Sequence, residues 1–115
     1  MVDTATCNGA NTIGCGQTWP TIATGLGPRA LALNPASHIV YTANLGDASS
    51  SIVHGARCNA IDHAGCDDRT PRVAVGNAPT DVALDITTGT VYVADAFAAP
   101  PATSTRGIVS VFGSR

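Results

Sequence analysis

The sequence contains no lysine, and it has few charged or aromatic residues of any kind. Charged residues make up 12% of its 115 positions, aromatic residues make up 4%, and the formal net charge is -2. A nucleic-acid-binding surface needs clustered lysine or arginine, so this composition argues against one. No stretch approaches the roughly 18 uninterrupted apolar residues of a membrane helix, and we expect no membrane span. Residues 1–6 have neither the basic nor the apolar region typical of a signal peptide.

What the chain does contain is typical of β-structure. Hydrophobic residues, mostly alanine and valine, make up 44% of the chain, with 12 glycines and 7 prolines. Low charge, frequent turn residues and many threonines and valines together indicate an all-β globular fold.

A tandem repeat of about 51 residues organises the sequence. Shifting the chain by 51 positions places Tyr41 on Tyr92 without a gap. The same shift aligns cysteines, glycines and prolines: Cys7 with Cys58, Cys15 with Cys66, Gly25 with Gly76, Pro20 with Pro71, and Pro28 with Pro79. Since these residue types rarely coincide at one constant offset by chance, we interpret the two halves as copies of one structural unit.

Each unit is predicted to contain four short strands, because its apolar runs are short and bounded by turn-forming residues. The predicted strands are 21–24, 30–33, 39–43, 51–53, 72–75, 82–84, 90–94 and 108–112, with the end of a further strand at residues 2–3. Four strands at this period are typical of the blades of a β-propeller, and a solenoid is the alternative. We therefore expect a partial blade at 1–25, a complete blade at 26–76 and a partial blade at 77–115.

The runs 40–44 (Val-Tyr-Thr-Ala-Asn) and 91–95 (Val-Tyr-Val-Ala-Asp) resemble the Tyr-Val-Thr-Asn (YVTN) repeat of bacterial β-propellers. Residues 25–28 and 76–79 are similar to the Gly-Asn-Gly-Pro turn of that family. Asn34 and Pro35 also match the family, whereas Asp85 and Ile86 depart from it. The resemblance implies a propeller fold. It implies no single activity, because the family spans surface-layer proteins, lactonase-like and lyase-like enzymes, and other secreted proteins.

Two blades' worth of strands cannot close a ring, because propellers have about four to eight blades. We expect the remaining blades to belong to a longer chain of which this is a piece. The alternatives are self-association into a six- or eight-bladed ring, and an open pair of blades with exposed apolar faces.

Two cysteine pairs share one spacing: Cys7 with Cys15 and Cys58 with Cys66 are each eight residues apart. Each pair brackets the connection between a third and a fourth strand, whose ends a hairpin brings within reach of a disulfide. Such pairs predict an oxidising, extracytoplasmic compartment. The alternatives are buried free thiols and a metal site, although zinc ligands usually lie two to four residues apart.

No catalytic or metal-binding constellation is evident, and no cofactor is predicted. The three histidines, His38, His54 and His63, lack metal-binding spacing and are interpreted as turn residues. Asp67 and Asp68 are interpreted as a solvated turn rather than a calcium site, which would need more oxygen ligands.

The predicted binding residues lie at one end of the strands. The connection from Asp95 to Arg106 is eight residues longer than its counterpart and contains Phe97, so it is the best candidate for contact with a ligand. Arg29 and Asp81 begin first strands near the same end. We therefore predict a non-enzymatic scaffold of a secreted or envelope protein that binds a protein or glycan. The alternative is a fragment of a propeller enzyme of lactonase or lyase type.

Overall fold

The computed structural model describes residues 1–18, 20–97 and 107–113, and within these residues the fold is all-β. Two antiparallel sheets are formed. The four-stranded sheet has the order β1 (Pro28–Asn34), β2 (Ile39–Asn44), β3 (Ser49–His54) and β4 (Arg72–Ala74). The three-stranded sheet has the order β5 (Asn77–Asp85), β6 (Thr90–Phe97) and β7 (Ile108–Gly113). A short 3-10 turn, η1 (Ile13–Gly16), precedes them.

The first hairpin turn of each sheet has the same geometry. His38, between β1 and β2, has a φ of 60°, and Gly89, 51 positions later between β5 and β6, has a φ of 65°. The Asn34 side chain accepts a hydrogen bond from the Ala36 N–H at 3.0 Å, and the Asp85 carboxylate accepts one from the Thr87 N–H at 3.0 Å. An acceptor side chain followed by a left-handed residue therefore reverses the chain in both units.

Most of the predicted strands are confirmed, and most are longer by one or more residues than predicted. Two of the predictions are wrong: neither the segment 21–24 nor residues 2–3 form a strand. Residues 2–3, its expected neighbour, lead into a turn in which the Thr6 and Cys7 amides donate to the Asp3 carbonyl. A strand needs a ladder partner, and none lies beside residues 21–24 in the described part of the chain. Thr70 Oγ1 instead donates to the Ala23 carbonyl at 2.7 Å.

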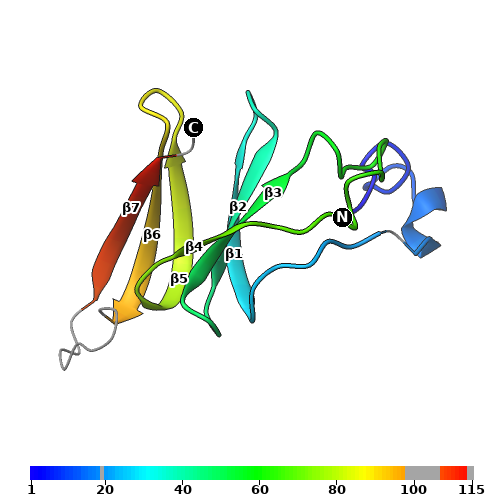
Figure 1. Ribbon diagram of the computed structural model, residues 1–115. Coiled ribbons are helices and arrows are strands. Elements are labelled where there is room, and N and C mark those ends of the chain that lie inside the picture. The colour runs from blue at the N-terminus through cyan, green and yellow to red at the C-terminus, as the bar shows by residue number, and fades with distance from the viewer. Residues whose placement is uncertain (19, 98–106, 114–115) are drawn as a thin grey trace.

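The two sheets stack on one another, with β5 against β1 and β2 (Figure 1). We call the side of each sheet that bears Tyr41 or Tyr92 its tyrosine face, and the side that bears Leu33 or Leu84 its leucine face. The tyrosine face of the four-stranded sheet packs on the leucine face of the three-stranded sheet. The core residues are Ala30, Ala32, Tyr41, Ala43 and Ile52 from the first face and Val82, Leu84, Val91, Val93 and Phe112 from the second, with Ile39 and Val75.

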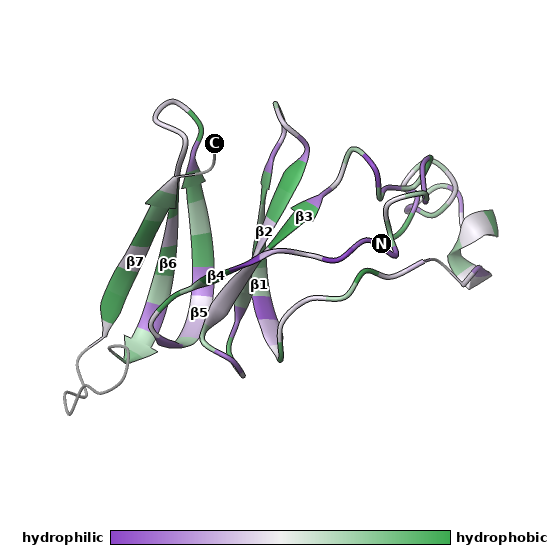
Figure 2. Ribbon diagram, in the orientation of Figure 1, coloured by the Kyte–Doolittle hydropathy of each residue, from purple (hydrophilic) through white to green (hydrophobic). Residues whose placement is uncertain are grey.

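An aromatic contact joins the two sheets across this interface. The rings of Tyr41 on β2 and Phe112 on β7 meet edge to face, with centroids 5.9 Å apart, which is a preferred geometry for aromatic pairs. Figure 2 shows hydrophobic residues, in green, along the strands of both sheets, including the outer strand β7. No helix in residues 1–18, 20–97 and 107–113 has the length and apolar character to cross a membrane.

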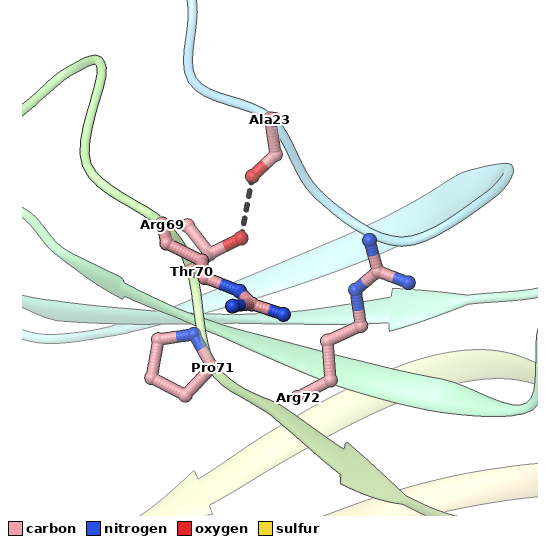
Figure 3. Close-up of a pocket in the computed structure, with 5 residues that line it drawn as sticks. All are labelled: Ala23, Arg69, Thr70, Pro71 and Arg72. Carbon is pink, nitrogen blue, oxygen red and sulfur yellow. Dashed lines mark hydrogen bonds between the residues drawn. The ribbon is translucent and has the colours of Figure 1, made fainter.

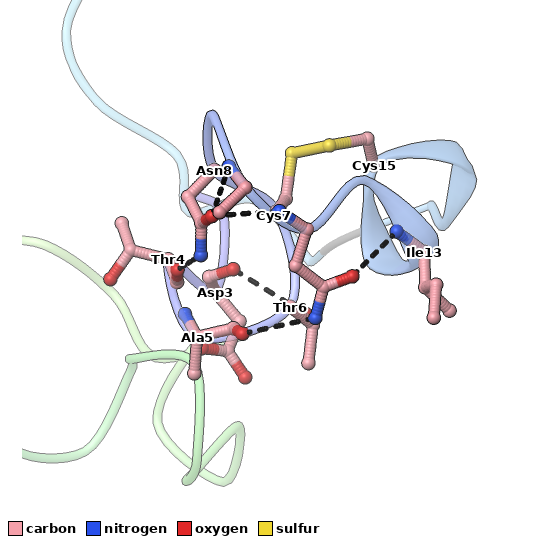
Figure 4. The surroundings of a disulfide bond; sticks show 10 residues. Asp3, Thr4, Ala5, Thr6, Cys7, Asn8, Ile13 and Cys15 are labelled. Carbon is pink, nitrogen blue, oxygen red and sulfur yellow. Dashed lines mark hydrogen bonds between the residues drawn. A yellow bond between two sulfur atoms is a disulfide. The ribbon is translucent and has the colours of Figure 1, made fainter.

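Both predicted disulfides are confirmed. Cys7–Cys15 and Cys58–Cys66 have Cα–Cα distances of 4.8 and 4.7 Å, and Figure 4 shows the first bond in its loop. The two loops fold alike: the residue after the first cysteine donates its amide to a carbonyl three residues later, at 2.7 Å in one loop and 2.8 Å in the other. The repeat therefore extends from the sheets into the loops, and the bonds fit an oxidising compartment.

Candidate functional site

A buried polar network lies where β2 ends and β3 begins. The Asn44 carboxamide, which is 0% exposed, donates to the hydroxyls of Ser49 and Ser51 at 2.9 Å each and accepts from the Thr42 hydroxyl at 2.8 Å. The Gly25 N–H donates to the Ser51 hydroxyl at 2.9 Å. Because buried polar groups are costly when unpaired, this network ties the loop before β1 to the β2–β3 turn.

The second unit repeats the centre of this network with a carboxylate in place of the amide. The Gly76 N–H donates to the Ser110 hydroxyl at 3.1 Å, and that hydroxyl donates to Asp95 Oδ2 at 2.6 Å. Val93 stands where the first unit has the threonine, and within the described residues Asp95 Oδ1 has no hydrogen-bond partner. Asp95 is only 4% exposed. Its carboxylate therefore links β6 to β7 and is not presented on an open surface.

Asp47 is the charged group of the first network. Its carboxylate accepts hydrogen bonds from the Ser49 hydroxyl and, at 3.0 Å, from the Leu26 N–H, and it pairs with the Arg72 guanidinium at 3.2 Å. These contacts hold the pKa of Asp47 below its ordinary value. The Ser49 hydrogen bond is the largest cause, partial burial acts against it, and the Leu26 amide and the Arg72 charge add to the lowering. Asp47 is therefore a structural anion at neutral pH.

A surface pocket of about 430 Å³ lies between residue 23 and residues 69–72, and two of its lining side chains are arginines. Figure 3 shows the guanidinium groups of Arg69 and Arg72 on one side of the segment and the ring of Pro71 on the other. Arg72 is engaged by Asp47. Arg69 is exposed and makes no ion pair with any other described residue. The pocket is therefore suited to a small anionic group.

Two of the predicted binding residues, Arg29 and Asp81, line different pockets. Arg29 borders a shallow pocket of about 420 Å³ on the leucine face of the four-stranded sheet. Asp81 borders another, of about 130 Å³, on the tyrosine face of the three-stranded sheet. Phe97, at the end of β6, is exposed. Arg106 lies outside the described residues, as does most of the long connection that contains it.

Sequence reasoning missed both the Asn44 network and the arginine pocket. A signal for the network is present in the repeat, since a glycine, an amide or acid, and a serine recur at matched places: Gly25, Asn44 and Ser51, then Gly76, Asp95 and Ser110. The pocket has no such signal, because Thr18 and Thr21 stand 51 positions before its two arginines. A feature of one unit only cannot be found by comparing the units.

The histidines and acidic residues of the described ranges form no group of three that would hold a metal ion. His38, His54 and His63 are all exposed. Asp68 pairs with Arg57 at 2.6 Å on the surface of the second disulfide loop. His54 ends β3, whereas His63 and Asp68 lie in the connection between β3 and β4.

Comparisons with known proteins found no matching protein family, no matching curated sequence and no matching solved structure.

Proposed function

We propose that this chain is a β-propeller-type repeat segment of an extracytoplasmic protein and serves as a non-enzymatic scaffold that binds a protein or glycan. The observation that carries the proposal is the stacking of two repeated units through opposite faces of equivalent sheets. Four-stranded sheets repeated face to face around an axis are the architecture of propellers. The two disulfides support an oxidising compartment.

The arginine pocket supports a ligand that presents a carboxylate. Guanidinium groups bind carboxylates through short, charge-assisted hydrogen bonds. The pocket has two of them, of which Arg72 is already fixed in place by Asp47 and Arg69 is exposed. Uronic acids of a glycan and aspartate side chains of a protein both supply this group, so the pocket fits either kind of partner.

Titration calorimetry with two pairs of probes tests the proposal and separates the two sources. The glycan pair is a uronic-acid trisaccharide and its neutral counterpart, and the peptide pair is a tetra-aspartate and a tetra-asparagine. We expect one acidic probe to bind, its neutral partner not to bind, and the binding to weaken as salt is raised.

Matched arginine variants locate the binding. Arg69→Gln is expected to remove it, because this guanidinium has no other ion-pair partner among the described residues. Arg29→Gln removes the same charge from a different pocket and is expected to leave the affinity within about twofold. Equal affinities in the two variants, or no binding of either acidic probe, would contradict the proposal.

A further inference from the structure

We infer that copies of this chain assemble head to tail, with the tyrosine face of the three-stranded sheet of one copy packed on the leucine face of the four-stranded sheet of the next. The inference rests on the β-propeller-type stacking of the proposed function, but it uses neither arginine of the pocket. It follows from which faces the structure buries and which it leaves open.

The two open faces are the repeat equivalents of the two buried ones. The buried tyrosine face carries Tyr41, and the shift of 51 places Tyr92 at the same point of the open tyrosine face. The buried leucine face carries Val82 and Leu84, whose equivalents on the open leucine face are Leu31 and Leu33. The buried interface therefore shows how a tyrosine face packs on a leucine face, and the two open faces are one of each kind.

Both open faces are apolar. On the leucine face, Leu31 is 67% exposed and Leu33 is 52% exposed, and on the tyrosine face Tyr92 is 41% exposed and Val109 is 58% exposed. The equivalent Tyr41 is 1% exposed. Exposed apolar surface of this kind marks a site of association, and here the two faces differ from one another, so the contact is heterologous.

A groove on the open leucine face can receive the exposed tyrosine. It has a volume of about 410 Å³, and its lining includes Leu31, Val40 and Val53. At the buried interface Tyr41 meets Phe112. Val53 in the groove is the repeat equivalent of Phe112. Val53 pairs with Val40, the residue before Tyr41, just as Phe112 pairs with Val91, the residue before Tyr92. The ring of Tyr92 of a second copy can therefore pack against apolar side chains in this groove.

Charge favours the same arrangement. Arg29 is the charged residue beside Leu31 at the open leucine face, and Asp81 is the charged residue beside Tyr92 at the open tyrosine face. Both lie on the first strand of their sheet. At the buried interface the first strands β1 and β5 are in contact. Head-to-tail stacking with the same geometry brings these opposite charges to the same part of the contact.

The same stacking brings residues 21–24, which belong to neither sheet of the described chain, beside the edge strand β7 of the next copy. β7 is an edge strand of its sheet in the described residues, while β3, its equivalent, pairs with β4. The β3–β4 register sets Ser49 opposite Ala74 and Ser50 opposite Val73. If β7 of one copy pairs with residues 21–24 of the next copy in this same register, Ile108 lies opposite residue 23 and Val109 lies opposite residue 22. Residues 21–24 of one copy then complete the sheet of its neighbour. Rings of two to four chains contain four to eight sheets, the number that closes a propeller.

Light scattering coupled to size-exclusion chromatography tests this assembly on the oxidised chain. We expect a discrete species of two, three or four times the 11.5 kDa chain mass. Leu31→Glu places a charge on one open face and Val109→Glu on the other, and each variant alone is expected to be monomeric because every contact needs both faces. Ile61→Glu, at an exposed position in a disulfide loop, is the matched control and is expected to keep the wild-type mass.

Mixing the two variants distinguishes a head-to-tail contact from a symmetric one. The Leu31→Glu chain retains its tyrosine face and the Val109→Glu chain retains its leucine face, so an equimolar mixture is expected to form a one-to-one dimer. A monomeric wild type, a wild-type mass unchanged in both variants, or no dimer in the mixture would overturn the inference. Titration of the monomeric Val109→Glu chain with the acidic probes reports on the arginine pocket separately, because Val109 does not line the pocket and no second copy lies beside residue 23 in a monomer.

Discussion

Replacing Gly25 by alanine should destabilise the protein through the polar network that this glycine contacts. Gly25 is buried, and an added Cβ would lie 2.5 Å from Asn44 Nδ2, 2.7 Å from Asp47 Oδ2 and 2.7 Å from Ser49 Oγ. Overpacking of this kind costs about 1–3 kcal/mol. Displacing the Gly25 N–H from the Ser51 hydroxyl removes a further contribution of about 0.5–1.5 kcal/mol. We therefore expect the free energy of unfolding to fall by about 2–4 kcal/mol.

Urea denaturation of the oxidised protein, followed by circular dichroism, measures this loss. Gly9→Ala is the matched control, because no atom lies within 4 Å of its added Cβ, and we expect it to change the stability by less than about 0.5 kcal/mol. Gly76→Ala tests the repeat, since its Cβ would lie 2.8 Å from Ile108 and 2.9 Å from Asp95. If Gly25→Ala and Gly9→Ala unfold at the same urea concentration, the reasoning from close contacts is refuted.

Three further predictions concern the disulfides, the acid stability and the core. Replacing both Cys58 and Cys66 by serine should lower the free energy of unfolding of the sheets by about 2–3 kcal/mol. The same change at Cys7 and Cys15 should have a much smaller effect on the urea midpoint, because the first disulfide loop joins no strands among the described residues. Because the pKa of Asp47 is lowered in the folded state, its carboxylate stabilises the fold at pH values above its ordinary pKa of 3.8. This contribution is lost as the pH falls through the folded-state pKa. The urea midpoints at pH 5 and pH 3 should therefore differ more for the wild type than for Asp47→Asn. Tyr41→Ala should cost about 3–5 kcal/mol, and Tyr92→Ala clearly less when both are measured at protein concentrations low enough to keep the chain monomeric; equal losses would contradict the assignment of buried and open faces.

The strands and disulfides could be predicted because their causes are local or repeated. Runs such as 39–43 and 90–94 are rich in β-branched and aromatic residues and end at turn residues, and these preferences operate over a few neighbouring positions. The cysteine pairs recur at one spacing, so either pair supports the interpretation of the other.

The segment 21–24 shows where local reasoning fails. Its composition suits a strand as well as that of β4, its repeat equivalent, which is a strand because β3 lies beside it. Strand formation depends on a partner that is distant in sequence, and the residues of the segment carry no information about whether that partner is present.

The polar network was missed because inward and outward positions depend on register. Asn44 and Asp95 have the composition of turn formers at the ends of apolar runs, yet both are buried against a serine of the next strand. A one-residue change of pairing would place them on the opposite face of the sheet. Only the register identifies which hydroxyls face them, and so the repeat of the three residue types is the available signal.

Nuclear Overhauser spectroscopy of the ring protons of Tyr41 and Phe112 tests the stacking of the two units most directly. These rings come from different sheets and have centroids 5.9 Å apart, so stacking of the units predicts cross-peaks between them. It predicts none between Tyr92 and Phe112, which lie on opposite faces of their sheet. Cross-strand peaks within each sheet are expected in any case and show that both sheets are folded. If those peaks are present while the Tyr41–Phe112 peaks are missing, the two repeat units do not stack through these faces and the proposed arrangement is wrong.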